Sequence, residues 1–266
     1  MSYFPRAIGS DYRNGIDLRD PQLTISLEGI THALILGGMA NPRKCEEYKK
    51  ESYQCNVEGP LRLGRALLMK GIMPLFFSTD YVFDGKEESY SVDALPTPLN
   101  EYGRQKAELE KRAKQLGAII IRLSKVYGVE RGDGSFFDEM LALLEAGKKI
   151  PAAVDQFVNL ISVQEVIEGI ALLCQHNLPG IYHLSGKECE SRYTIANLVA
   201  TKLNISLDQI IPIKLADLDS FTRPSRVFLQ PTFPAKSWRE GVEQIVSRNG
   251  KRVLGWCESH DGRKTR

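Results

Sequence analysis

A tyrosine and a lysine four residues apart have the types and spacing to do acid–base chemistry. Tyr102 and Lys106 begin a segment with helical periodicity, so both side chains lie on one helix face. An ammonium group within about 4–6 Å of a phenol lowers the pKa of the phenol from about 10, and the tyrosine can then exchange protons near neutral pH. The hydroxyl of Thr79 can hydrogen-bond the same substrate oxygen. The alternative for such a pair is a half-buried tyrosine beside a solvated lysine.

The elements that must position these residues follow from the apolar pattern. Buried strands are predicted at residues 33–37, 73–78 and 118–123. A long helix from about Lys44 to Lys70, kinked or restarted by Pro60, connects the first two, and a helix from about Tyr102 to Gln115 connects the next two. Alternating strands and helices predict an α/β fold, a Rossmann-like doubly wound parallel sheet with both faces covered. Thr79 then lies at the carboxyl edge of the sheet, where ligands bind.

The pattern changes after Gly128. Further helices are predicted at 136–145, 162–174, 193–203 and 235–246, with a short strand at 180–185. Ser162 and Glu165 form a capping box at the start of the second of these helices. We predict a Rossmann-like dinucleotide-binding domain over 1–150. A smaller, mostly helical substrate lobe over 151–250, interleaved with the sheet, and a flexible tail over 251–266 complete the chain.

Composition and charge exclude several classes of partner. The 266 residues carry 35 Lys+Arg and 33 Asp+Glu, a net charge of +2, which gives no electrostatic case for nucleic acid or membrane partners. The five cysteines are scattered and form no CxxC pair, which argues against a metal site and against a disulfide framework. No apolar run approaches the roughly 18 residues of a membrane helix, and the first residues, Met1 to Arg6, have no apolar core of the kind that a signal peptide contains. We therefore expect a cytoplasmic protein in a reducing compartment.

Several motifs resemble the extended short-chain dehydrogenase/reductases, and more narrowly the dTDP-4-dehydrorhamnose reductase family. The resemblance is carried by residues 17–20, 56–60, 78–85, 98–103, 122–128, 155–156 and 222–224. The most specific of these is the Ser-Thr-Asp-Tyr-Val-Phe block that begins at Ser78. Related dehydratases typically carry a glutamate where Tyr81 stands, so this residue favours simple ketone reduction over dehydration or epimerisation.

The resemblance implies a role for each matching residue and a cofactor, NADPH or NADH. Tyr102 would donate the proton to the keto oxygen, Thr79 would polarise the carbonyl, and Lys106 would hold the nicotinamide ribose and tune Tyr102. Further cofactor contacts are implied for Asp17, Leu18, Gly37, Gly38, Met39 and Ser78. Substrate contacts are implied for Asp80, Phe83, Lys125 and Arg223. The planar fork of an arginine suits a diphosphate, although a surface ion pair is the alternative for Arg223.

Two features depart from the family pattern. Lys125 stands where these reductases commonly place an aromatic residue near the sugar, which leaves the identity of the sugar open. The chain also lacks the glycine-rich GxxGxxG turn whose backbone amides hold the cofactor's pyrophosphate. We therefore expect the family's first strand and helix to be missing, through truncation or natural loss, with the chain starting near the second strand at residues 6–10. Such a chain would bind NAD(P)H poorly and turn over slowly.

The leading functional hypothesis is NAD(P)H-dependent reduction of a nucleotide-linked 4-keto sugar that feeds cell-surface polysaccharide synthesis. The alternatives are a non-catalytic subunit, like the regulatory subunit of methionine adenosyltransferase, and an inactive truncated reductase. A sugar-nucleotide epimerase or dehydratase is a weaker third option. The expected partner is a nucleotide sugar, and a homodimer stays open.

Overall fold

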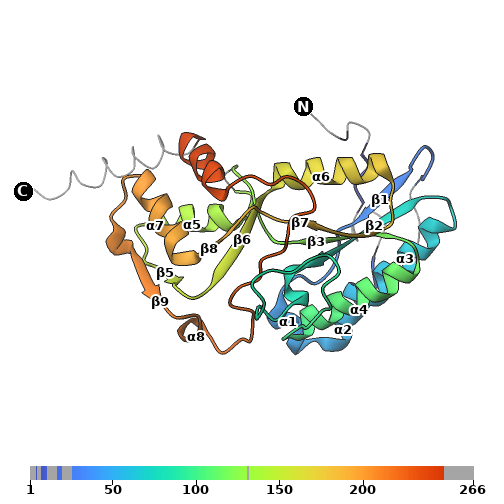
Figure 1. Ribbon diagram of the computed structural model, residues 1–266, viewed down its shortest axis with the longest axis horizontal. Coiled ribbons are helices and arrows are strands. Elements are labelled where there is room, and N and C mark those ends of the chain that lie inside the picture. The colour runs from blue at the N-terminus through green and yellow to red at the C-terminus, as the bar shows by residue number, and fades with distance from the viewer. Residues whose placement is uncertain (1–3, 5–6, 11–16, 20–25, 131, 249–266) are drawn as a thin grey trace, which may run out of the picture.

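The computed structural model describes residues 4, 7–10, 17–19, 26–130 and 132–248. Figure 1 shows two lobes along the long axis of the molecule. One lobe contains a parallel sheet between helices, and the other contains small sheets with helices around them. The α/β class predicted from the sequence is therefore confirmed.

Four parallel strands form the main sheet, in the order β1-β2-β3-β7. Their bounds are His32–Ile35, Met73–Thr79, Ile119–Leu123 and Gly180–Leu184. These strands lie within two residues of the predicted ranges. They are nearly continuous apolar runs because helices cover both faces of the sheet.

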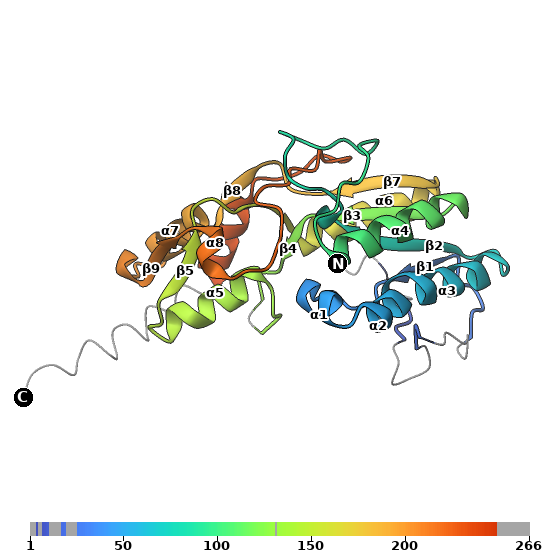
Figure 2. The ribbon, with the colours of Figure 1, turned by 90° about the horizontal axis from the view of Figure 1, so that it is seen from below.

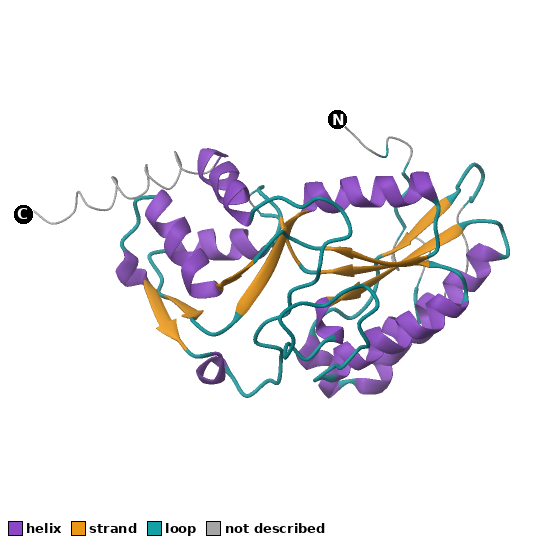
Figure 3. Ribbon diagram, viewed as in Figure 1, coloured by secondary structure: helices purple, strands orange, loops and turns teal. Residues whose placement is uncertain are grey.

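The two faces of the sheet bury different residues of the same strands. On one face Leu61 of α3 (Gly59–Leu68) shares a core cluster with Phe76 and Ile120, and α4 (Glu101–Gln115) adds Leu109. On the opposite face α6 (Val163–His176) packs on Leu75, Phe77, Ile119 and Ile121. The alternation arises because successive strand side chains point to opposite faces. Figures 1 and 3 show α6 on one side of the sheet and α3 and α4 on the other.

The long helix predicted between the first two strands is broken more often than expected. It consists of α1 (Pro42–Glu47), α2 (Lys49–Tyr53), a π-helical stretch (Gln54–Glu58) and α3. Pro60 stands in the first turn of α3 and has no backbone N–H, so the regular hydrogen-bond ladder cannot run through it. The widened turn before it carries Asn56, and π-helical turns occur frequently at functional sites.

The second lobe combines the predicted helices with five short strands. Its strands are β4 (Lys125–Tyr127), β5 (Ile150–Ala153), β6 (Phe157–Ser162), β8 (Cys189–Ser191) and β9 (Ile210–Ile213). Its helices are α5 (Phe136–Glu145), α7 (Arg192–Lys202), α8 (Leu215–Leu218) and a helix at 238–248. Figure 2 shows these elements gathered at one end of the molecule. The strands are too short to give a clear two-residue period in the sequence.

The chain passes between the lobes more than once. Helix α5 packs in the second lobe although it precedes residue 150, whereas α6 and β7 belong to the first lobe. Residues 7–10 are neither helix nor strand, so the second strand predicted there is not found in the described part of that range. The tail predicted at 251–266 lies outside the described residues. Within the described ranges, no helix is both long and apolar enough to cross a membrane.

Candidate active site

The first turn of α4 meets the carboxyl end of β2 and brings three predicted residues together. The Asn100 side chain caps α4 by accepting a hydrogen bond from the Gly103 N–H at 2.9 Å. A Cβ on Gly103 would lie 2.2 Å from the Tyr81 carbonyl oxygen, so only glycine lets the helix approach the loop after β2 this closely. As a result, Tyr102 faces Thr79, and Lys106 follows one turn later.

Lys106 is buried against the strand that ends at Thr79. Its side chain is 9% exposed, and its Nζ donates a hydrogen bond to the Phe77 carbonyl oxygen at 2.8 Å. The same Nζ lies 6.0 Å from the centre of the Tyr102 ring. Burial lowers the pKa of Lys106 to about 8, so the ammonium is charged at neutral pH and loses its proton just above it.

The pKa of Tyr102 is raised, which contradicts the prediction that Lys106 lowers it. Burial is the largest cause, the negative charge of Asp80 adds to it, and the nearby Thr79 hydroxyl offsets part of the rise. Desolvation outweighs the cation because the two groups are not in direct contact. Tyr102 therefore stays protonated at neutral pH and can serve as a proton donor.

Asp80 and Lys125 lie beside this pair, where the lobes meet. The Thr79 hydroxyl donates a hydrogen bond to the Asp80 carboxylate at 3.0 Å. Burial raises the pKa of Asp80 to about 6, with Lys125, the solvent-exposed first residue of β4, acting in the opposite direction. The ring of Tyr81 meets that of Tyr102 edge to face, with centres 6.0 Å apart.

Two arginines of the second lobe lie within electrostatic range of Tyr81. Arg192, the first residue of α7, stacks its guanidinium over the Phe136 ring at 5.2 Å, and its buried Nε has no hydrogen-bond partner among the described residues. Arg223 also has a buried Nε without a partner in the described ranges, while its Nη2 binds Asp219. Sequence reasoning missed Arg192, because an arginine after a serine cap is too common to single out.

The predicted cofactor loop after β1 is fixed by a residue to which no role was given. Asn56 accepts a hydrogen bond from the Met39 N–H at 2.7 Å and donates one to the Met39 carbonyl at 3.1 Å. Its Nδ2 also donates to the Gln105 side chain on α4 at 2.9 Å. A Cβ on Gly38 would lie 2.7 Å from the Asn56 Oδ1, and the φ of Gly38 is 156°. The loop 37–39 is thereby tied to the helix that carries Tyr102.

Three other residues that were predicted to contact the cofactor or the substrate bind other residues of the protein. The Ser78 hydroxyl donates to Glu110 at 2.5 Å, and the Asp17 carboxylate binds the Arg19 guanidinium, which lowers the pKa of Asp17 to about 2. Phe83 is completely buried and stacks on Tyr90 with ring centres 4.1 Å apart. The substrate contact expected of Phe83 is therefore corrected: it is a core residue, because no part of its surface can reach a ligand.

Comparison with known proteins agrees with the fold. The family described as the RmlD substrate binding domain matches residues 22–250. The chain belongs to the RmlD substrate binding domain family. It is 31% identical over 213 residues to the spore coat polysaccharide biosynthesis protein SpsK of Bacillus subtilis (strain 168), covering 76% of this chain and 74% of SpsK. It is 28% identical over 195 residues to the methionine adenosyltransferase 2 subunit beta of Bos taurus, covering 69% of this chain and 58% of that protein. The chain thus spans less than two thirds of that relative.

Solved structures resemble this member of the RmlD substrate binding domain family over most of its length. The dTDP-4-dehydrorhamnose reductase of Bacillus anthracis str. Ames, in complex with NADP, gives a TM-score of 0.74 at 25% identity and covers 82% of this chain and 80% of its own. DesIV, a dTDP-glucose 4,6-dehydratase from Streptomyces venezuelae with NAD and TYD bound, gives 0.70 at 17% identity and covers 85% and 76%. The second likeness is one of fold alone.

The described residues of this RmlD family member fit one end of a nicotinamide dinucleotide. Lys106, Tyr102 and Thr79 carry an ammonium and two hydroxyls, the groups that the family resemblance assigns to the ribose and to the reacting carbonyl. At the other end, no glycine-rich turn opens a helix in the described ranges, and the Leu18 side chain lies 2.6 Å from the Cβ position of Gly37. The pyrophosphate thus lacks its usual amide cradle within the part of the chain that the structure describes.

Proposed function

We propose that this protein reduces the keto group of a nucleotide-linked 4-keto sugar with NAD(P)H, as an oxidoreductase of the dTDP-4-dehydrorhamnose reductase type. The observation that carries the proposal is the convergence of Thr79, Tyr102 and Lys106 at the carboxyl edge of the parallel sheet. The similarity to a reductase solved with NADP supports the cofactor. The similarity to a spore coat polysaccharide biosynthesis protein supports a role in making surface polysaccharide.

A bound reduced nicotinamide would supply a hydride to the carbonyl carbon of the sugar. Tyr102 donates the proton to the carbonyl oxygen, and its raised pKa keeps that proton available at neutral pH. The Thr79 hydroxyl turns from Asp80 to the same oxygen and polarises the carbonyl. The Lys106 ammonium then stabilises the phenolate that Tyr102 becomes, which it can do below a pH of about 8.

The substrate side of the site favours an anionic part of the substrate, such as the diphosphate of a nucleotide sugar, which stays attached to the sugar during the reduction. Arg192 and Arg223 come from the second lobe, and Lys125 is the first residue of β4, a strand of the same lobe. Each arginine keeps a buried Nε without a partner among the described residues, so each retains a donor for an anion. Planar guanidinium groups bind phosphate oxygens two at a time.

The reaction is tested by incubating the protein with a dTDP-linked 4-keto-6-deoxy sugar and NADPH deuterated at the transferable position. We expect deuterium at the carbinol carbon of the sugar, detected by mass spectrometry. Tyr102→Phe removes only the proton donor, so it should lower the rate by about 10²–10⁴-fold while sugar-nucleotide binding is retained. Tyr48→Phe, at an exposed tyrosine outside the site, is the matched control and should keep the rate. A Tyr102→Phe rate near that of the unmodified protein would remove Tyr102 from the mechanism.

A second candidate function is regulation of a partner enzyme. It is favoured by the relatives named methionine adenosyltransferase 2 subunit beta, which are 26–28% identical to this chain. Co-purification with a methionine adenosyltransferase catalytic subunit, together with a change in the kinetics of that enzyme, would support this function. Deuterium transfer without such an association would leave the reductase as the function.

A further inference from the structure

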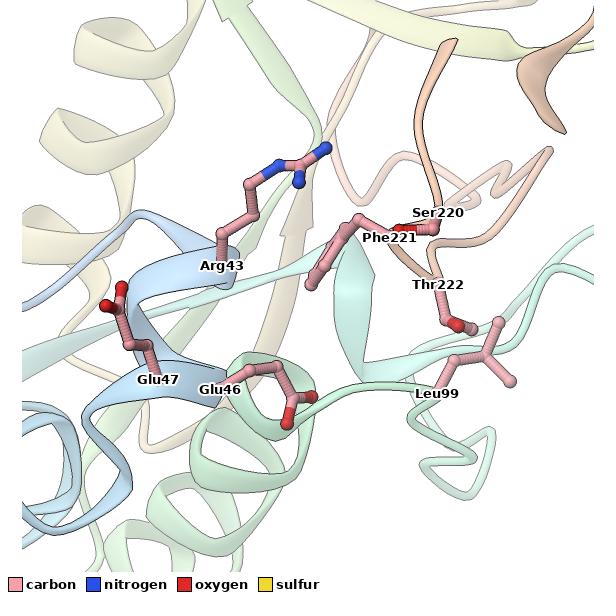
Figure 4. A pocket seen from close by; sticks show the side chains of 7 residues that line it. All are labelled: Arg43, Glu46, Glu47, Leu99, Ser220, Phe221 and Thr222. Atoms are coloured by element: carbon pink, nitrogen blue, oxygen red, sulfur yellow. The ribbon is translucent and has the colours of Figure 1, made fainter. Parts of the chain in front are cut away.

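A short strap, residues 219–223, ties the second lobe to α1 of the first lobe. The Asp219 carboxylate accepts two hydrogen bonds from the Arg223 Nη2, both at 2.6 Å, and also pairs with Arg43 of α1. The Phe221 ring lies 5.4 Å from the Arg43 guanidinium and 5.2 Å from that of Arg223. Figure 4 shows Arg43 and Phe221 facing each other from these two parts of the chain.

The strap also borders the helix that carries the proposed proton donor. The Asn100 side chain, which caps α4, donates a hydrogen bond to the Thr222 carbonyl at 3.2 Å. A pocket of about 490 Å³ lies between the strap and α1, lined by Arg43, Glu46, Glu47, Leu99, Ser220, Phe221 and Thr222. A change in the strap would therefore alter the contacts of the Asn100 side chain at the first turn of α4.

One edge of the Arg223 guanidinium binds Asp219 of the strap, while its positive charge acts on residues of the site. Its side chain is 15% exposed, its Nη2 is taken by Asp219, and its buried Nε has no partner among the described residues. The positive charge of Arg223 acts on Tyr81 and on Arg192. A guanidinium in this state resembles an anion site that already holds an anion, and that anion is the carboxylate of Asp219.

We propose that Asp219 is an internal competitor for Arg223: an anionic ligand entering the site displaces the Asp219 carboxylate from the Arg223 guanidinium. This proposal rests on the proposed function for the kind of ligand, a nucleoside diphosphate. Phosphate oxygens match the arginine fork better than a single carboxylate does, because a phosphate carries more charge and more acceptor positions. The contact between Asp219 and Arg223 is thus an autoinhibitory contact that the substrate relieves.

The substitution Asp219→Asn tests the proposal with little change of shape. The Asp219 Oδ1 also accepts the Phe221 N–H at 2.9 Å, and an asparagine oxygen can keep that bond. With the competing charge removed, we expect dTDP to bind about 10-fold more tightly, equivalent to about 1.4 kcal/mol, in calorimetric titrations. In an Arg223→Gln background the same change should bring no gain, because the guanidinium for which Asp219 competes is gone.

Glu139→Gln is the matched control for a general change of electric field. Glu139 is exposed on α5, its charge acts on Lys125 and Arg192, and it forms no ion pair with Arg223. We expect this control to change dTDP affinity by less than about 3-fold. Equal gains from Asp219→Asn and Glu139→Gln would overturn the proposal, as would a gain from Asp219→Asn that persists without Arg223.

The titrations separate this inference from the proposed function. If the unmodified protein binds dTDP and Asp219→Asn leaves the affinity unchanged, the competitor role is wrong while the proposed ligand stands. If no form binds dTDP, the nucleotide ligand of the proposed function is wrong, and the same series with inorganic pyrophosphate decides the role of Asp219. A 10-fold gain for pyrophosphate on Asp219→Asn would then support competition for an anion, and no gain would overturn it.

Discussion

Burial pushes Tyr102 and Lys106 toward their uncharged forms, although both lie on one face of α4. The pKa of Tyr102 rises and that of Lys106 falls to about 8, each mainly through loss of solvent. At neutral pH the site thus holds a protonated phenol and an ammonium close to its titration point. This arrangement favours proton donation to a substrate oxygen and makes the ammonium sensitive to mildly alkaline pH.

The affinity for the cofactor should fall as Lys106 loses its proton. We expect the dissociation constant of NADPH to rise between about pH 7 and about pH 9, since the ammonium proposed to hold the ribose becomes neutral. Lys106→Met should weaken binding at neutral pH and abolish this pH dependence in titrations carried out up to millimolar concentrations of NADPH. Lys111→Met, at an exposed position on the same helix, is the control and should keep both properties. An unchanged dissociation constant in Lys106→Met would confine Lys106 to stabilising Tyr102.

The charged side chain of Asp80 should lower the free energy of unfolding at neutral pH. Its pKa is about 6 in the folded protein against 3.8 for the free group, so the folded state binds the proton more tightly, and stability is lost as the pH rises from about 4 through 6. Asp80→Asn removes this loss and should raise the free energy of unfolding by about 1–3 kcal/mol at neutral pH. In chemical denaturation the difference should narrow as the pH falls toward 4. A difference that does not depend on pH would show that the charge of Asp80 is not the cause.

At the scale of elements, a buried polar network holds α4 on the sheet. Glu110, one turn after Lys106, accepts hydrogen bonds from Ser78 of β2 at 2.5 Å and from Arg122 of β3 at 3.0 and 2.8 Å. Arg122 also donates to the His183 Nε2 at 3.2 Å, and burial lowers the pKa of His183 to about 4, so that ring is neutral and can accept. The network reaches the residue next to Thr79 and thereby aligns helix and strand.

Breaking this network should strongly lower the free energy of unfolding. Glu110 and Arg122 are 3% and 1% exposed, so Glu110→Ala leaves the buried charge of Arg122 without a counter-charge and should lower the free energy of unfolding by about 3–5 kcal/mol. The double change Glu110→Leu with Arg122→Met should recover much of that loss, because it removes both charges. Denaturant titrations measure both effects.

The pair Arg104–Glu101 on the same helix, whose arginine side chain is 47% exposed, is the control for these measurements. Arg104→Ala should cost less than about 1 kcal/mol, because solvent screens a pair whose arginine is exposed. A loss on Glu110→Ala as small as that of the control would contradict the structural role of the buried pair.

At the scale of the whole molecule, the two ends of the proposed cofactor site differ in the protein groups that could bind the cofactor. Tyr102 and Lys106 are proposed to contact the nicotinamide end, whereas the described ranges contain no glycine-rich turn for the pyrophosphate. A hydrogen bond to a charged group contributes roughly 1.5–3 kcal/mol, so the loss of two or three costs several kcal/mol. We therefore expect residues 1–266 to bind NADPH and NADH in the millimolar range or weaker, since each 1.4 kcal/mol is tenfold in affinity. Micromolar binding in calorimetry would show that another part of the chain fills this role.

Local spacing was enough to predict much of the framework. The Tyr102–Lys106 pair, a strand at 73–78 that the structure extends to Thr79, and the capping box of Ser162 and Glu165 were all predicted from the sequence. Helix geometry fixes which residues share a face, and a cap needs only its own first turn. These features therefore depend on residues that are neighbours along the chain.

Tertiary structure alone decided the chemistry of the site. Whether Phe83 lies in the core or in the site, and whether the pKa of Tyr102 rises or falls, depends on which distant segments surround these side chains. The same holds for Asn56, which binds Met39 across 17 residues, and for Arg192, which enters the site from the second lobe. Periodicity in a sequence records a residue's neighbours in the chain, whereas solvent exposure and electrostatic environment are set by neighbours in space, which only the folded chain brings together.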